Sequence, residues 1–167
     1  MEAALFLADE PLTTRKLAEV VGLKDGHEAR RAILELRELY KSDGTAFQIE
    51  EIAGGFQLFT RPEFHPWLVR AQRRGADLNL TPSSLETLAI VAYKQPIMRA
   101  EVDTLRGVAS AEILRVLLEK GLIRIRGRHD SLGRPQLYGT SKKFLQLFGL
   151  NSLAELPEVE SLPKPII

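Results

Sequence analysis

The fold is decided by residues 11–23, PLTTRKLAEVVGL, which have a counterpart in PIMRAEVDTLRGV at residues 96–108. Setting one proline over the other aligns the two segments without a gap, at an offset of 85 residues. The matched positions cover a turn, the expected buried face of a helix and the glycine that ends it: Leu12 with Ile97, Leu17 with Val102, Val20 with Leu105, Gly22 with Gly107 and Leu23 with Val108. A repeat of this kind predicts two copies of one supersecondary unit.

The first copy lies in a region whose periodicity changes from helical to extended. Apolar spacings of three and four predict helices over residues 1–8, 13–21 and 25–42, and alternation over residues 47–58 predicts a β-hairpin that turns at residues 53–55. The helix starts have suitable caps, namely Thr13 and the pair Asp25 and Glu28. A further short helix is predicted over residues 62–72. Three helices followed by a two-stranded hairpin make a winged helix, with the hairpin as the wing.

The second copy repeats this order. Thr81 and Pro82 begin a helix, further helices are predicted at residues 99–105 and after Ser110, and a second hairpin and a closing helix follow at residues 123–138 and 142–148. The predicted fold is mainly α with small β-hairpins, arranged as tandem winged-helix (helix-turn-helix) domains. The predicted boundaries are a first domain at 1–75, a linker at 76–80, a second domain at 81–150 and a C-terminal tail at 151–167.

The composition is that of a folded globular chain, with 167 residues of which 44% are apolar and 27% charged. The absence of cysteine excludes disulfides, thiol nucleophiles and thiolate metal sites, and it fits a reducing compartment. The longest wholly apolar run, Leu88–Tyr93, is too short to span a bilayer, and Glu2 and Asp9 lie where a signal peptide carries positive charge. These features predict a cytoplasmic protein that does not associate with membranes.

No arrangement of residues predicts catalysis. His27, His65 and His129 lie far apart in the sequence and match no metal-ligand spacing. The glycines at 54 and 55 lie in a hairpin turn and do not precede a Lys-Ser or Lys-Thr helix start, so they do not form a phosphate-binding loop. Consecutive carboxylates at 50 and 51 point to opposite faces of a strand. We therefore expect a protein that is not an enzyme and that has no cofactor and no metal.

The net charge of +1 hides a segregation of charge along the chain. Residues 1–60 carry seven basic and eleven acidic side chains, whereas residues 121–143 carry six basic and one acidic. These six are candidates for contact with DNA phosphates without reading of sequence: Arg124, Arg126, Arg128, Arg134, Lys142 and Lys143. The opposing interpretation is that alternating arginines form the solvated face of an edge strand, where charge blocks strand pairing. The predicted third helices open with residues 25–28, DGHE, and 109–112, ASAE, which do not suit base recognition.

Two regions carry more apolar residues than a small core requires. The stretch from Leu85 to Tyr93 is apolar nearly all round its predicted helix, and residues 93–97 extend it. Such residues are either buried between the two units or exposed as a groove for a partner. In the first unit, a similar excess suits self-association through residues Leu5, Phe6, Phe56, Phe59, Phe64 and Trp67.

Several of these stretches together resemble a known family. They are the run TLAIVAYKQPI at residues 87–97, RAEV at 99–102, LRGV at 105–108, LLEKGLI at 117–123, GRP at 133–135 and LYGT at 137–140. This pattern resembles the segregation and condensation protein B family, ScpB, over about residues 2–157. Met98 and Ala109 depart from the family pattern at helix caps, which puts local stability in doubt more than function.

The resemblance implies a non-enzymatic subunit of the bacterial SMC condensin complex. Such a subunit is a homodimer of tandem winged helices that binds the kleisin subunit ScpA, and through it SMC, and it acts in chromosome condensation and segregation at the nucleoid. The resemblance assigns dimerisation to the first unit and much of the kleisin contact to the second, and it favours the partner groove. The expected kleisin site comprises Leu88, Val91, Tyr93, Gln95, Pro96 and Ile97, with Arg99 and Arg106 as its polar rim. The alternative is a DNA-binding transcriptional regulator that uses the basic second wing.

Overall fold

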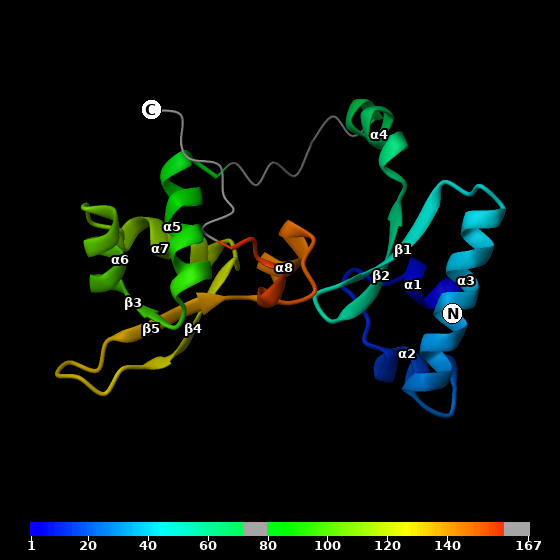
Figure 1. Cartoon of the computed structure of the whole chain (residues 1–167), viewed down its shortest axis with the longest axis horizontal. Coiled ribbons are helices and arrows are strands. Elements are labelled where there is room, and N and C mark those ends of the chain that lie inside the picture. Colours follow the sequence, from blue (N-terminus) through cyan, green and yellow to red (C-terminus); the bar gives the residue numbers. More distant parts are fainter. Residues whose placement is uncertain (72–79, 159–167) are drawn as a thin grey trace. The chain divides into compact units, whose positions relative to one another are not determined.

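The computed structural model describes residues 1–71 and 80–158, and the chain divides into two compact units, Met1–Asp77 and Leu78–Ile167. Within the described residues, each unit combines α-helices with one small antiparallel sheet (Figure 1). This mixture confirms the prediction of helices with small β-hairpins. Residues 76–79 of the predicted linker and 159–167 of the predicted tail lie outside the described residues.

The first unit follows the predicted order of elements. They are α1 (Glu2–Phe6), α2 (Thr14–Val21), α3 (Gly26–Ser42), β1 (Phe47–Ile52), β2 (Gly55–Thr60), the 3₁₀ turn η1 (Pro62–Phe64) and α4 (His65–Ala71). The helix starts are capped as the sequence predicts, because Thr13 Oγ1 accepts from the Lys16 amide and Asp25 Oδ1 accepts from the amides of the next turn. Gly22 ends α2 at φ +75°.

The core of the first unit lies between its helices and the β1–β2 hairpin. Its buried members come from α1, α2, α3 and both strands: Leu5, Leu17, Ala18, Ala29, Ile33, Tyr40, Ile49 and Phe56. The Leu12 amide donates to the Phe56 carbonyl at 3.0 Å, and the Phe56 amide donates to the Leu12 carbonyl at 2.8 Å. A Cβ on Gly55 would lie 2.9 Å from the Leu12 carbonyl, so the segment before α2 approaches β2 closely only because residue 55 is glycine.

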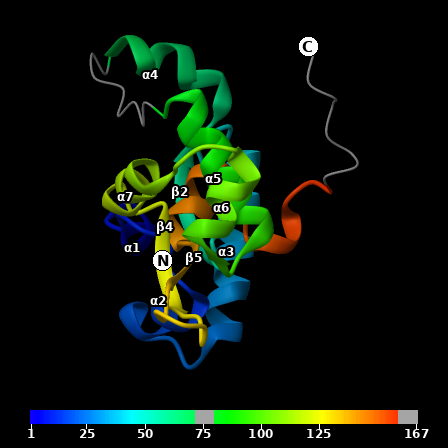
Figure 2. The ribbon, with the colours of Figure 1, turned by 90° about the vertical axis from the view of Figure 1, so that its left-hand side faces the viewer.

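The second unit repeats the order of three helices and a hairpin and adds one strand. Its elements are α5 (Pro82–Lys94), β3 (Ile97–Met98), α6 (Arg99–Arg106), α7 (Ala111–Glu119), β4 (Ile123–Arg128), β5 (Gln136–Thr140), α8 (Lys142–Phe148) and the 3₁₀ turn η2 (Leu153–Glu155). The predicted hairpin of β4 and β5 is confirmed, and β3 extends it into a sheet of order β3-β5-β4. Helix α5 contacts both α6 and α7, and Figure 2 shows the unit from the side of these two helices.

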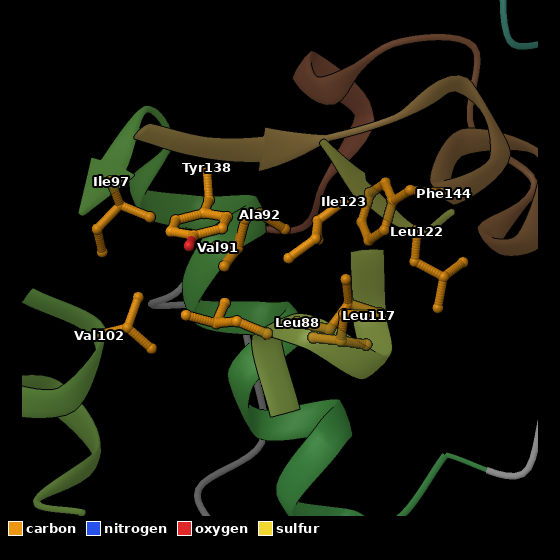
Figure 3. Close-up of a cluster of buried hydrophobic side chains, with 11 residues drawn as sticks. Leu88, Val91, Ala92, Ile97, Val102, Leu117, Leu122, Ile123, Tyr138 and Phe144 are labelled. Carbon is orange, nitrogen blue, oxygen red and sulfur yellow. The ribbon is translucent and has the colours of Figure 1, made fainter. Parts of the chain in front are cut away.

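The core of the second unit forms between these helices and one face of the sheet (Figure 3). Its members are Leu88, Val91, Ala92, Ile97, Val102, Leu114, Leu117, Leu122, Ile123, Tyr138 and Phe144. The first part of the predicted tail packs on this unit, because Leu156 contacts the core and the Tyr93 hydroxyl donates to the Pro157 carbonyl at 2.8 Å. Residues 151–158 are therefore continuous with the second unit.

The two units carry the predicted repeat in their geometry. Ile97 pairs with Tyr138 of β5, and its counterpart Leu12 bridges to Phe56 of β2. Leu17 and Val102 are both fully buried, and the glycines that end the two helices both have left-handed φ angles. One expectation was wrong, since Val20 and Leu105 are each 55% exposed. In both helices this residue lies in the last turn, beyond the core.

Candidate functional site

The family-like run at residues 93–97 fixes the sheet to α5. The Gln95 side chain donates from Nε2 to the Ala92 carbonyl at 3.0 Å and to Thr140 Oγ1 at 2.9 Å. Its Oε1 accepts from the Thr140 amide at 2.9 Å and from Thr140 Oγ1 at 3.1 Å. Gly139 leaves room for this contact, because a Cβ there would lie 2.8 Å from Gln95 Oε1. Gln95 therefore acts as a structural latch on β5.

The longer family-like run at residues 87–97 supplies core residues, which corrects the predicted kleisin site. Leu88, Val91 and Ile97 are 1%, 0% and 3% exposed, so no partner can contact their side chains in the folded unit. They are buried because α5 is covered on three sides, by α6, α7 and the sheet. Tyr93 is half-buried and Pro96 is exposed, so these two keep some surface.

Arg106 was expected at an exposed rim, and the structure places it inside the unit. Its side chain is 5% exposed, and its Nε lies 3.2 Å from Glu86 Oε2, which joins α6 to α5. Among the described residues its Nη1 has no hydrogen-bond partner. Burial along the α5–α6 contact explains why this arginine is not available as a rim residue.

Asp103 anchors the start of α7, a role that the sequence did not reveal. Ser110 is the N-cap residue of α7, as predicted, but its side chain makes no hydrogen bond to the helix. Its hydroxyl donates to Asp103 Oδ1, and its amide donates to the same oxygen at 2.7 Å. The hydrogen bond from the Ser110 hydroxyl lowers the pKa of Asp103 below its usual value, and the positive charges of Arg99 and Arg106 add to this effect. The carboxylate is therefore ionised near neutral pH.

A hollow of about 380 Å³ lies where the start of α6 meets the end of the β4–β5 hairpin. We call it the wing groove, and its lining residues are Met98, Arg99, Ala100, Asp103, Arg128, Gly133, Arg134, Pro135, Gln136 and Tyr138. Three arginines and one aspartate give it a positive balance, while methionine, proline and tyrosine supply apolar surface. A groove of this composition suits an extended segment that carries both acidic and apolar side chains.

The loop between β4 and β5 positions the arginines of the wing groove. Arg128 donates from Nη1 to the Arg134 carbonyl at 3.3 Å, and the Arg134 amide donates to the Ser131 carbonyl at 2.9 Å. Arg134 has φ +42°, a left-handed conformation that costs energy for a residue with a Cβ. Arg99 Nε lies 3.9 Å from Asp103 Oδ2, so the charge of the guanidinium is only partly neutralised. Positive charge is thus held at the groove on both sides.

A β-bulge in β4 puts the arginines of this strand on different faces of the sheet. Simple alternation along the sequence would place Arg124, Arg126 and Arg128 on one face. Arg124 lies opposite Gly139 and Arg128 lies opposite Gln136, with a shift of register between Ile125 and Gly127. Because Gly139 and Gln136 are three residues apart on β5, they lie on opposite faces, and so do Arg124 and Arg128. Arg126 lies over Gly139, since a Cβ there would be 2.7 Å from Arg126 Cγ. The expectation of one arginine face was wrong for Arg128.

The predicted dimerisation residues of the first unit also divide into two groups. Leu5 and Phe56 are each 1% exposed and belong to the core, so as interface residues they were wrong. Phe59 is half-buried, whereas Phe6 and Trp67 are 70% and 72% exposed and Phe64 is at the margin of exposure. Helix α4, which carries Trp67, contacts chiefly η1. Large apolar side chains thus remain on the surface of this unit.

Neither a metal cluster nor a spanning helix is found in residues 1–71 and 80–158. No group of three or more His, Cys, Asp or Glu side chains there could hold a metal ion. No helix in these ranges is both long and apolar enough to cross a membrane.

Comparison with known proteins decides the family. Residues 1–159 match the family described as segregation and condensation complex subunit ScpB. The chain belongs to the ScpB family. Segregation and condensation protein B of Symbiobacterium thermophilum is 45% identical over 96% of this chain and 72% of its own, and that of Desulforamulus reducens is 42% identical over 96% and 87%. A solved ScpB N-terminal domain, described as a dimer complexed with an ScpA peptide, is 33% identical over 45% of this chain and 89% of its own, with a TM-score of 0.40.

Sequence reasoning found Arg99, Arg128 and Arg134 but did not bring them together. It missed the groove residues Met98, Asp103 and Gln136 as a site, because none belongs to a periodic or charged run. The available signals were three family-like stretches that each contribute residues to the wing groove: RAEV at 99–102, GRP at 133–135 and LYGT at 137–140.

Proposed function

We propose that this ScpB-family chain is a non-enzymatic adaptor built from two winged-helix modules. In this proposal it binds the kleisin subunit ScpA, and through it SMC, and it acts in chromosome condensation and segregation at the nucleoid. Family membership supports the proposal, since the family is described as a subunit of a segregation and condensation complex. The order of three helices and a hairpin in each unit supports the winged-helix assignment.

The wing groove is the proposed kleisin site, and its chemistry is the observation that carries this assignment. Arg99, Arg128 and Arg134 line this hollow together with the apolar residues Met98, Pro135 and Tyr138. This mixture suits a kleisin segment that carries acidic and apolar residues together. Of the residues predicted for kleisin binding, Arg99 lies in this groove, whereas the buried Leu88, Val91 and Ile97 support the fold around it. The latch formed by Gln95 holds the β5 strand that forms one wall.

Binding of purified ScpA to the full chain, measured by isothermal titration calorimetry, tests the proposal. Replacing Arg128→Glu together with Arg134→Glu reverses two charges at the groove, and we expect the affinity to fall by about 100-fold or more, on the order of 3 kcal/mol. The control is Arg15→Glu with Lys41→Glu, which makes the same change of net charge on exposed residues of the first unit. Equal affinity of the groove variant and the wild type would remove the wing groove as the site.

Dimerisation is proposed to use the apolar surface of the first unit. Phe6 and Trp67 expose large side chains that a second copy would bury, and burial of an aromatic side chain is worth about 2–3 kcal/mol. Sedimentation equilibrium of the full chain tests this. Trp67→Ser and Phe6→Ser should each shift the wild-type dimer toward monomer, while Leu132→Ser, at a fully exposed residue of the second unit, should not. A wild-type monomer at micromolar concentration would contradict dimerisation.

A sequence-specific transcriptional regulator is the less favoured function. The helix that would enter the major groove begins, in the first unit, with the Asp25 cap and carries Glu28 in its first turn, and Glu112 occupies the first turn of α7. Carboxylates at these positions repel phosphates and lack the donors that arginine offers to guanine.

A further inference from the structure

Arg124 and Arg126 of β4 and Lys142 and Lys143 at the start of α8 all expose their side chains. None of these four cations has an ion-pair partner within residues 1–71 and 80–158. By contrast, Arg115 of the neighbouring α7 pairs with two glutamates of its own helix. We call these four residues the outer basic face.

The backbone brings the two pairs of cations close together. The Ser141 amide donates to the Leu122 carbonyl at 3.1 Å, and its hydroxyl donates to the Gly121 carbonyl at 2.6 Å, so α8 begins beside the start of β4. The Lys143 side chain lies across the same turn, with its Cδ 3.7 Å from where a Cβ on Gly121 would be. Figure 1 shows α8 at the end of the hairpin opposite its turn. The lysines therefore extend the charge of β4 along the unit.

The outer basic face is separate from the wing groove. Arg124 and Arg126 lie on the Gly139 side of the sheet, which faces away from the core residue Tyr138, whereas the bulge turns Arg128 to the other side. No residue of the outer basic face lines the wing groove. A kleisin segment in the groove would thus leave these four cations available.

The position of β4 at the edge of its sheet accounts for charge on this strand, since charged side chains, lysine especially, protect an edge from pairing. It does not account for the two lysines of α8, which lie outside the sheet. Here all charged residues of β4 are arginines, and two lysines outside the sheet continue the pattern. Positive charge without acidic neighbours suits a polyanion with a regular repeat of charge, and duplex DNA carries one negative charge per about 1.7 Å of its axis.

We propose that the outer basic face binds the phosphate backbone of duplex DNA without sequence preference. The four side chains supply up to four phosphate contacts, and because backbone contacts carry no base information, every DNA sequence offers the same site. This goes beyond the adaptor function and does not depend on it. It gives the second unit two independent surfaces, one for a protein segment and one for DNA.

Fluorescence anisotropy of the full chain with a labelled duplex of random sequence tests the proposal. With four contacts, the logarithm of affinity should fall with a slope of about −3.6 against the logarithm of salt concentration, a loss of about 150-fold between about 50 and 200 mM salt. Arg124→Gln with Arg126→Gln should reduce the slope to about −1.8, and Lys142→Gln with Lys143→Gln should reduce it equally, since each pair removes two contacts.

The control for net charge is Arg15→Gln with Lys41→Gln in the first unit, which should leave the slope and the affinity unchanged. Circular dichroism confirms that each variant is folded. Absence of DNA binding by the wild type at about 50 mM salt would overturn the proposal, because backbone contacts are strongest there. Equal weakening by the control pair would also overturn it, since the protein's overall charge would then account for binding.

Discussion

Replacement of Gln95 by alanine removes the latch between α5 and β5. The change deletes four hydrogen bonds and leaves the Thr140 amide and hydroxyl, at a residue only 5% exposed, without protein partners. An unsatisfied buried polar group costs about 1–3 kcal/mol, and the space left by the side chain lets water restore part of this. We expect the second unit to lose about 3 kcal/mol of stability, which corresponds to a fall of roughly 15 °C in its melting temperature.

Amide hydrogen exchange of the full chain measures this effect where it arises. Exchange at Thr140 should be about 100-fold faster in Gln95→Ala, because each 1.4 kcal/mol changes the opening equilibrium tenfold. Lys94→Ala is the matched control, since Lys94 is the exposed neighbour at the same helix end. Unchanged protection of Thr140 in Gln95→Ala would refute the latch.

Three further predictions concern packing and pH. Gly139→Ala should destabilise the second unit by about 1–3 kcal/mol in thermal unfolding, because the added Cβ would overlap the latch; wild-type stability would contradict this close approach. Burial and the hydrogen bond to Glu2 raise the pKa of Tyr40 to about 12, so stability should be lost as pH rises between about 10 and 12, and a Tyr40→Phe variant with the same alkaline profile would count against it. The lowered pKa of Asp103 stabilises the folded state above pH 3.8, so acid titration should show stability lost as pH falls below that value, and less so in Asp103→Asn.

The elements of the fold could be predicted because their signals are local. A cap such as Thr13 or Asp25 acts within one turn, and a glycine such as Gly22 or Gly107 ends a helix through its own backbone. Strand β3 was not predicted, because a strand of two residues is too short to show an alternating pattern. Its partner strand β5 also lies about 40 residues later in the sequence.

The site could be predicted only in part, because side-chain exposure depends on tertiary packing. An apolar helix such as Leu85–Tyr93 has the same sequence whether its faces meet a partner or its own unit, and here α6, α7 and the sheet bury Leu88 and Val91. The bulge at Arg126 reverses the face of Arg128, and alternation along the sequence does not show such a shift. The kleisin site expected from the resemblance included the core residues Leu88, Val91 and Ile97, whereas other family-like stretches, such as GRP at residues 133–135, lie in the wing groove.

We propose that the wing groove of the second unit receives the kleisin partner. Hydrogen exchange of the full chain with and without saturating ScpA tests this most directly, because it maps protection along the whole backbone. If the wing groove binds ScpA, then ScpA should slow exchange at residues 98–103 and 128–138, which contain the groove residues, while β4 around Arg124 exchanges as in the free protein. Protection confined to other segments, with none at the groove, would contradict it.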